Sequence, residues 1–131
     1  MTPAPALAPR VILIDGDGVV LQVLQERIAE THEVAAFPRG ESALRGLVPC
    51  EERVIFVIDL SFRDAGDVFE LKKKLAFRFP NAKFMLTVST LDLGVAFPEL
   101  AKARGFDACL TKPYRLPALL EKIEEIEREW Q

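Results

Sequence analysis

The 131-residue sequence lacks any apolar run long enough to cross a lipid bilayer. Residues 1–9 also lack the basic start and the apolar stretch of a signal peptide. We therefore expect a cytoplasmic protein with no membrane partner. An excess of basic residues is missing too, because the net charge is −3. A negative net charge gives no general attraction for the phosphate backbone, so no direct contact with nucleic acid is expected.

Cysteine and histidine are scarce. Cys50 and Cys109 lie far apart and match no metal-ligand spacing, and disulfides are uncommon inside cells, so both are expected to be free thiols. His32 is the only histidine, and no cysteine lies near it in the sequence. We expect His32 to have a surface role at a boundary between a loop and a strand, and not a catalytic one.

Apolar residues, in contrast, are plentiful, since they make up 50% of the chain. This content supports a buried core, and the length suits a single domain. Residues 1–9 contain three prolines and three alanines, a composition that buries little surface. We expect residues 1–9 to be a disordered lead-in and residues 10–131 to form the folded domain.

Apolar runs and helical patterns alternate along that domain. Strands are predicted at residues 11–14, 34–37, 54–58, 83–86 and 107–110, and helices at 19–28, 40–47, 68–79, 91–104 and from about 117 onward. Alternation of this kind predicts an α/β fold, a doubly wound five-stranded parallel sheet with helices on both faces. In the flavodoxin-like strand order 2-1-3-4-5, ligands bind at the carboxyl ends of the strands.

Polar residues stand where four of these strands end. Asp15 follows the first strand, Asp59 the third, Thr87 the fourth, and Lys112 lies just beyond the fifth. Two carboxylates at one edge of a sheet repel each other, and a Mg²⁺ ion with hard oxygen ligands would relieve that repulsion. A carboxylate can also attack a phosphodonor, and a lysine can neutralise charge on the phosphoryl oxygens.

Four motifs in this order resemble the receiver domains of two-component response regulators. They are the acidic turn at Asp15, then Ile58-Asp59-Leu60, Leu86-Thr87 and Thr111-Lys112-Pro113-Tyr114, and the resemblance covers Arg10 to Trp130. It implies that Asp59 accepts a phosphoryl group, with Thr87 and Lys112 contacting that group. The domain would then be a phosphoacceptor in a phosphorelay, not an enzyme beyond self-catalysed phosphorylation and dephosphorylation.

The resemblance also implies a cofactor and partners. Mg²⁺ would be held by Asp15, Asp59 and the backbone carbonyl of Ser61, with Asp17 as a further candidate ligand. A histidine kinase or phosphotransfer protein would donate the phosphoryl group. A downstream protein target, or a second copy in a homodimer, would bind the face formed by the region 91–104, the strand 107–110 and the last helix. In the family the bond that corresponds to Lys112-Pro113 is often cis.

Several residues depart from the family pattern. Gly16 replaces a second acidic residue that contacts the metal, which leaves the site one charge short and lowers the expected affinity for Mg²⁺. Arg63 stands where proline is frequent, and Val88 stands where a small residue normally gives phosphodonors room to enter. Cys109 replaces an aromatic side chain that rotates inward on activation.

Other interpretations remain open from the sequence. Asp15 or Asp17 can be a helix cap, and the run Lys72-Lys73-Lys74 is interpreted as a solvated helix face. The segment around Asp15 and Asp17 also resembles the first motif of haloacid-dehalogenase-type phosphatases, with Asp15 as nucleophile and Asp17 as acid/base. A third alternative is an adaptor that keeps the receiver fold but binds its partner without phosphorylation.

Overall fold

The computed structural model describes residues 9–60, 68–89 and 97–130. Within these ranges strands and helices alternate along the chain. The order is β1 (Arg10–Ile14), α1 (Gly18–Ile28), β2 (Val34–Phe37), α2 (Gly40–Gly46), β3 (Val54–Asp59), α3 (Val68–Arg78), β4 (Lys83–Ser89), α4 (Phe97–Ala103), β5 (Ala108–Lys112) and α5 (Leu116–Arg128). None of the described helices is both long and apolar enough to cross a membrane.

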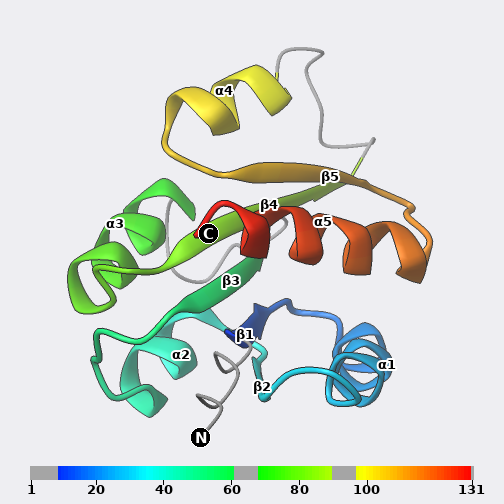
Figure 1. Ribbon diagram of the computed structural model, residues 1–131, viewed down its shortest axis with the longest axis horizontal. Coiled ribbons are helices and arrows are strands. Elements are labelled where there is room, and N and C mark those ends of the chain that lie inside the picture. The colour runs from blue at the N-terminus through cyan, green and yellow to red at the C-terminus, as the bar shows by residue number, and fades with distance from the viewer. Residues whose placement is uncertain (1–8, 61–67, 90–96, 131) are drawn as a thin grey trace, which may run out of the picture.

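The five strands form one sheet in the order β2-β1-β3-β4-β5, and every neighbouring pair is parallel (Figure 1). The predicted doubly wound α/β fold and its strand order are therefore confirmed. The strand β3 is buried throughout, whereas the edge strands β2 and β5 are half-buried along their whole length. All five strands run in the same direction, so their carboxyl ends meet at one edge of the sheet.

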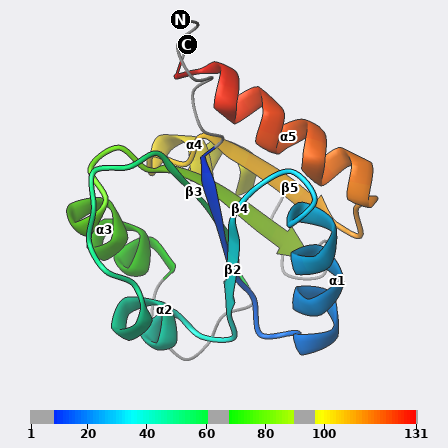
Figure 2. The ribbon, with the colours of Figure 1, turned by 60° about the horizontal axis from the view of Figure 1, so that its bottom comes forward.

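Helices cover both faces of the sheet, as Figure 2 shows with α1 and α5 on one side and α2 and α3 on the other. Residues of one strand alternate between the two sides: Ile12 and Phe56 pack in the core that contains α2, α3 and α4, whereas Val11 and Ile55 pack in the core beneath α1 and α5. Burial on both faces explains why the strands are continuous apolar runs. Each fully buried large apolar side chain contributes about 1.5–3 kcal/mol.

Two strands are longer at their carboxyl ends than the apolar pattern predicted. β4 continues past Leu86 to Ser89, and β5 continues past Leu110 to Lys112. The two extensions pair with each other, since Val88 lies opposite Thr111 and Ser89 opposite Lys112. Backbone pairing does not require apolar side chains, so a pattern based on hydrophobicity stops too early. As a result Lys112 is the last residue of a strand and not part of a loop.

The helix α4 is shorter than the predicted region 91–104, of which residues 91–96 lie outside the described residues. Pro98 falls in the first turn of α4, where its missing N–H costs no helical hydrogen bond. Gly105 has a φ of 87°, and the N–H of Phe106 donates to the carbonyl of Ala101 at 3.0 Å. This left-handed glycine ends the helix as a C-cap, which agrees with the predicted end of the helical region at residue 104.

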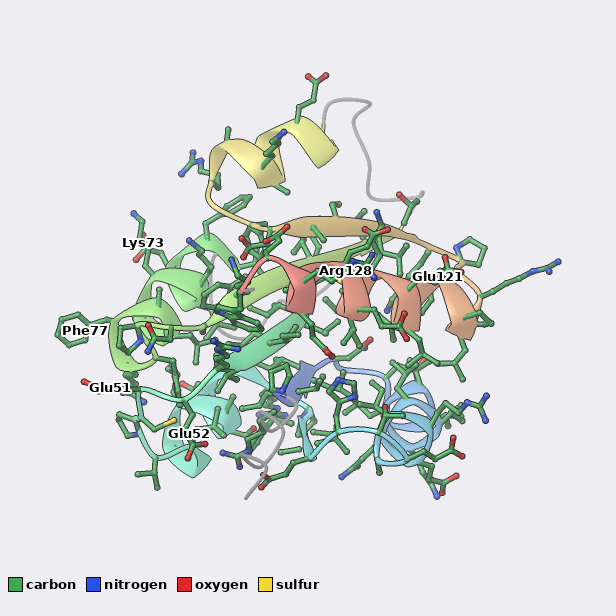
Figure 3. The ribbon with its side chains drawn as sticks, viewed as in Figure 1. Glu51, Glu52, Lys73, Phe77, Glu121 and Arg128 are labelled. Carbon is green, nitrogen blue, oxygen red and sulfur yellow. The ribbon has the colours of Figure 1, made fainter. Side chains whose placement is uncertain are left out.

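The lysine run on α3 is only partly a solvated face. Lys73 is exposed and Phe77, which is 90% exposed, points away from the molecule (Figure 3). Lys72, however, lies 5.3 Å from the ring centroid of Phe84 and is half-buried. The interpretation of the run as solvated was therefore wrong for Lys72, whose methylene groups and ammonium cover an aromatic ring.

His32 is less exposed than the sequence suggested. Its side chain is 9% exposed, and its two ring nitrogens contact the Thr31 hydroxyl at 2.7 Å and the Glu127 carboxylate. These contacts join the end of α1 to the end of α5. The predicted surface role was wrong, because a residue at a loop boundary is buried here by a helix 95 residues further along the chain.

Candidate functional site

The predicted polar residues do meet at the carboxyl edge of the sheet. Asp59 is the last residue of β3 and lies opposite Thr87 in the register of β4. Asp15 directly follows β1, and its N–H donates to the carbonyl of Phe37 at 3.2 Å. Backbone hydrogen bonds of this kind extend the ladder beyond the strands. The sheet itself therefore fixes where each side chain begins.

An ammonium group joins the two carboxylates. Lys112 Nζ lies 2.9 Å from Asp15 Oδ2 and 3.2 Å from Asp59 Oδ1. The hydroxyl of Thr87 donates to the same Asp59 Oδ1 at 3.2 Å. Asp15, Asp59, Thr87 and Lys112 thus form one connected group, as predicted. Asp59 Oδ1 is its centre, because it accepts from both a cation and a hydroxyl.

These polar side chains are buried. Asp59 and Thr87 are each 2% exposed and Asp15 is 6% exposed, whereas a quarter of the Lys112 side chain is accessible. A buried carboxylate is costly unless it is paired and hydrogen-bonded. One ammonium offsets two carboxylates, which leaves the group with one net negative charge. Clusters of buried ionisable groups are common at functional sites, which makes this group the candidate site.

The charges of the site affect two titratable neighbours. Burial by itself lowers the pKa of Lys112, but the hydrogen bonds and charges of Asp15 and Asp59 outweigh this effect, so the pKa lies above its ordinary value. Burial raises the pKa of Tyr114, Lys112 lowers it in part, and Asp15 and Asp59 raise it further. Lys112 is therefore firmly cationic at neutral pH, and the Tyr114 phenol lies within electrostatic range of the site.

Tyr114 is the one neighbour of the site whose influence the sequence reasoning missed. The signal was present in the motif Thr111-Lys112-Pro113-Tyr114, in which Tyr114 stands two residues beyond Lys112. The bond between Lys112 and Pro113 is cis, as the resemblance implied. The Tyr114 ring packs among the residues beneath α1 and α5.

Asp17 has a structural role. Its Oδ1 accepts from the N–H groups of Val19 at 3.1 Å and Val20 at 3.2 Å, so Asp17 is the N-cap of α1. The capping interpretation is therefore confirmed for Asp17. The N–H of Asp17 in turn donates to Asp15 Oδ1 at 2.9 Å, which holds the Asp15 carboxylate in place. Both capping bonds engage Asp17 Oδ1, so in either role that the sequence offered Asp17, as metal ligand or as acid/base, this oxygen is already shared with the helix amides.

The ligand set for Mg²⁺ is incomplete in the described residues. No group of three or more acidic, histidine or cysteine side chains that would hold a metal occurs in this part of the chain. Both oxygens of Asp15 already accept hydrogen bonds, one from Asp17 and one from Lys112. Gly16 offers no side chain, and the predicted ligand Ser61 lies outside the described residues. The side chains present do not fit a tightly held Mg²⁺ ion.

The structure describes some, but not all, of the other residues that differ from the family pattern. Val88 is completely buried in the core on the α3 and α4 side of the sheet, and Arg63 lies outside the described residues. Cys109 in β5 and Cys50 between α2 and β3 are both half-buried free thiols. The prediction of free thiols is therefore confirmed. Burial raises the pKa of the Cys109 thiol, which keeps it protonated and unreactive.

Neither protein-family models nor curated protein sequences match this chain. Many solved structures match its fold. A CheY-like response-regulator receiver domain protein from Methanospirillum hungatei JF-1 is 23% identical with a TM-score of 0.78, and the alignment covers 92% of this chain and 94% of that one. The BeF3-activated DrrB receiver domain is 20% identical with a TM-score of 0.74, covering 88% and 94%.

A structure named adenylate cyclase, from Rhodopirellula baltica, is 19% identical with a TM-score of 0.79, and covers 95% of this chain and 90% of that one. Identities this low carry no activity from one protein to another, so the cyclase name concerns that protein alone. What the three structures share with this chain is the overall fold. The chain therefore has the fold of a CheY-like response-regulator receiver domain.

Proposed function

We propose that this protein is a receiver domain of a two-component phosphorelay and that Asp59 accepts the phosphoryl group. The observation that supports this most is the pair of contacts on Asp59 Oδ1, from the ammonium of Lys112 at 3.2 Å and from the hydroxyl of Thr87 at 3.2 Å. A cation and a hydrogen-bond donor on one carboxylate suit the charge that a phosphoryl group would bring.

The transfer step uses side chains of this chain. An oxygen of Asp59 attacks the phosphorus of a phosphohistidine, or of a small acyl phosphate, and a new O–P bond forms. The P–N or P–O bond to the donor breaks, and the donor leaves with the electron pair. Lys112 offsets the negative charge on the phosphoryl oxygens during this transfer. The donor would be a histidine kinase or a phosphotransfer protein.

Thr87 links the modification to the rest of the fold. Its hydroxyl donates to Asp59 in the unmodified protein, and the same hydroxyl would donate to a phosphoryl oxygen after transfer. Thr87 lies in β4 opposite Leu110 of β5. A shift at Thr87 would therefore reach the face formed by α4, β5 and α5, where a downstream protein target or a second copy would bind.

The proposal is tested with acetyl phosphate as the donor and intact-protein mass spectrometry as the readout. The wild-type protein should gain one phosphoryl group, and Asp59→Asn should gain none. Asp107→Asn is the matched control, because Asp107 accepts a backbone N–H at the opposite edge of the sheet and an asparagine can do the same. Absence of an adduct on the folded wild-type protein at high donor concentration would reject the phosphoacceptor role.

One observation favours a second candidate, the adaptor that works without phosphorylation. Lys112 already bridges Asp15 and Asp59, and Gly16 removes an acidic side chain from the same edge. In this alternative the group only fixes the conformation of the edge. A partner that binds wild type and Asp59→Asn equally, before and after treatment with acetyl phosphate, would support the adaptor.

The phosphatase alternative is tested separately. It requires Asp17 as acid/base, yet this carboxylate accepts two N–H groups of α1. Hydrolysis of an aryl phosphate that is lost in Asp15→Asn and kept in Asp59→Asn would support it.

A further inference from the structure

We infer that Lys112 is the resident cation of this site, in place of a tightly bound divalent ion, and that Gly16 is the position that determines this. The inference concerns the site described above. Its consequence rests on the proposed function: Asp59 would accept a phosphoryl group without tightly bound Mg²⁺. Three observations support it: the contacts of Lys112, the shortage of carboxylates, and the open space at Gly16.

Lys112 is held where a cation is needed. It is the last residue of β5 and pairs with Ser89 of β4, so the sheet fixes its backbone. From there its ammonium contacts Asp15 Oδ2 at 2.9 Å and Asp59 Oδ1 at 3.2 Å. The positive charge between the carboxylates is therefore supplied by the chain itself.

A divalent ion would have to compete with this ammonium. Among the described residues, two carboxylates and one ammonium leave one net negative charge, which is weak attraction for an ion that gives up part of its hydration shell on binding. An ion that took Asp15 Oδ2 and Asp59 Oδ1, the two oxygens in contact with Lys112, would leave the ammonium without these partners in a partly buried position. Both effects oppose tight binding.

Nearby acids do not make up the shortage. Asp17 is the closest in sequence, but its carboxylate caps α1 and is exposed to solvent. Gly16, between Asp15 and Asp17, is exposed and carries no side chain. In the described residues the site therefore has two carboxylates and no third one to share a divalent ion.

Gly16 itself has room for a side chain. A Cβ atom built on Gly16 meets nothing within 4 Å, and Gly105 is the described residue with a positive φ, so the backbone at Gly16 suits an L-residue. Neither sterics nor backbone conformation requires glycine here. An aspartate at this position would add a carboxylate at the same edge without moving the backbone, and so supplies a direct test.

The experiment is a titration of the unmodified full-length protein with Mn²⁺, followed by electron paramagnetic resonance, and with Mg²⁺, followed by calorimetry. The variants are Gly16→Asp, Gly16→Asn and Lys112→Met. Gly16→Asn is the matched control for size, since it fills the same space and adds no charge. Lys122→Met is the control for loss of a lysine, because Lys122 is on α5 and pairs with Glu125.

Wild type should bind both ions weakly. Gly16→Asp should bind them at least about tenfold more tightly, because a third carboxylate adds both a ligand and a charge. Gly16→Asn should stay within about twofold of wild type, since it adds no charge. Lys112→Met should bind metal more tightly than wild type because the competing cation is gone, and Lys122→Met should not change.

Two results would overturn the inference. One is wild-type binding as tight as that of Gly16→Asp. The other is weaker or unchanged binding in a folded Lys112→Met variant, which would mean that Lys112 does not compete with the ion. If Lys112→Met does not fold, the comparison of Gly16→Asp with Gly16→Asn still decides the question.

Treatment with acetyl phosphate in the presence of EDTA or of Mg²⁺ separates this inference from the proposed function. The expected result is a wild-type adduct on Asp59 that forms with and without Mg²⁺. The predicted titration without any adduct would reject the phosphoacceptor role and leave the role of Lys112 intact. An adduct that requires Mg²⁺, together with tight wild-type binding, would reject the inference and leave the proposed function intact.

Discussion

Two lysines of this protein each contact two acidic side chains, one lysine at each end of the sheet. At the carboxyl end, Lys112 contacts Asp15 and Asp59, whose side chains are 9% and 2% exposed. At the amino end, Lys83 lies 3.8 Å from Asp107 and 3.3 Å from Glu129, whose side chains are 26% and 47% exposed. The number and sign of the charges are the same, and the exposure of the carboxylates differs.

The difference in burial gives the two groups different consequences. Lys83 also lies 5.5 Å from the ring centroid of Trp130, so it fastens the end of α5 to the start of β4 through several weak, hydrated contacts. Lys112 neutralises carboxylates that water does not reach, so its removal leaves charges without compensation. The same arrangement therefore adds a little stability at one end and compensates buried charges at the other.

The largest expected effect is that of Lys112→Met. Loss of the ammonium leaves two buried carboxylates close together, so the free energy of unfolding should fall by roughly 3 kcal/mol. Urea unfolding followed by the fluorescence of Trp130, the only tryptophan, measures this. Adding Asp59→Asn to Lys112→Met should recover much of the loss. A loss no larger than that of an exposed lysine would remove the contrast between the two ends of the sheet.

The next largest effect is expected at Asp17. It tests whether this third acid belongs to the buried group formed around Lys112. As an N-cap it should behave like other caps, so Asp17→Ala should lower the free energy of unfolding by about 1 kcal/mol. Asp17→Asn should keep most of the stability, because an amide oxygen also accepts from helix N–H groups. Equal losses in both variants would indicate that the charge of Asp17, and not its cap, matters.

A smaller effect is expected for Lys83→Met. Its ion pairs are partly exposed and the methionine side chain still covers Trp130, so the loss should be about 0.5 kcal/mol and at most about 1 kcal/mol. Salt should reduce this loss further, since exposed pairs are screened. The same urea experiment at low and high salt tests this. A loss as large as that of Lys112→Met, or one that salt leaves unchanged, would contradict the comparison.

The smallest effect is the dependence of stability on alkaline pH. Although burial opposes it, the carboxylates raise the pKa of Lys112 above its unfolded value of 10.5. The folded state therefore holds this proton more tightly, and the stabilisation is fully present below the unfolded pKa and is lost as pH rises through the folded pKa. Tyr114 contributes with the same sign, because burial raises its pKa above 10.0.

Thermal unfolding by circular dichroism at pH values on both sides of these pKa values measures the effect. The decrease in stability at alkaline pH should be steeper for wild type than for Lys112→Met, in which Tyr114 remains. Equal slopes for the two proteins would mean that the carboxylates do not hold the Lys112 proton.

The sequence predicted the architecture because burial on both faces leaves a plain signal. The strand 34–37 was placed at its observed bounds, and the parallel sheet followed from the alternation of strands and helices, whereas the strand order was taken from the flavodoxin-like fold. The carboxyl ends of β4 and β5 were placed too early, because Thr87, Thr111 and Lys112 continue the backbone ladder without apolar side chains. Hydrophobicity alone does not report such pairing.

The sequence predicted which residues form the candidate site, and it predicted the contacts between them less well. Asp15, Asp59, Thr87 and Lys112 meet because each stands at the same end of a strand, which position in the sequence reveals. The contact of one ammonium with both carboxylates depends on side-chain conformations. No pattern in a single sequence predicts these conformations. The buried position of His32 was missed for a related reason, since the helix that covers it lies far away in the sequence.

The bridge between Asp15 and Lys112 joins residues that are 97 positions apart in the chain. Asp15 follows β1 and Lys112 ends β5, and β3 and β4 lie between them in the sheet. A fragment must extend from Asp15 at least to Lys112 to contain both partners of the bridge. Any reactivity that Asp59 has with this bridge in place therefore requires both ends of the domain, and a shorter piece of the domain would lack it.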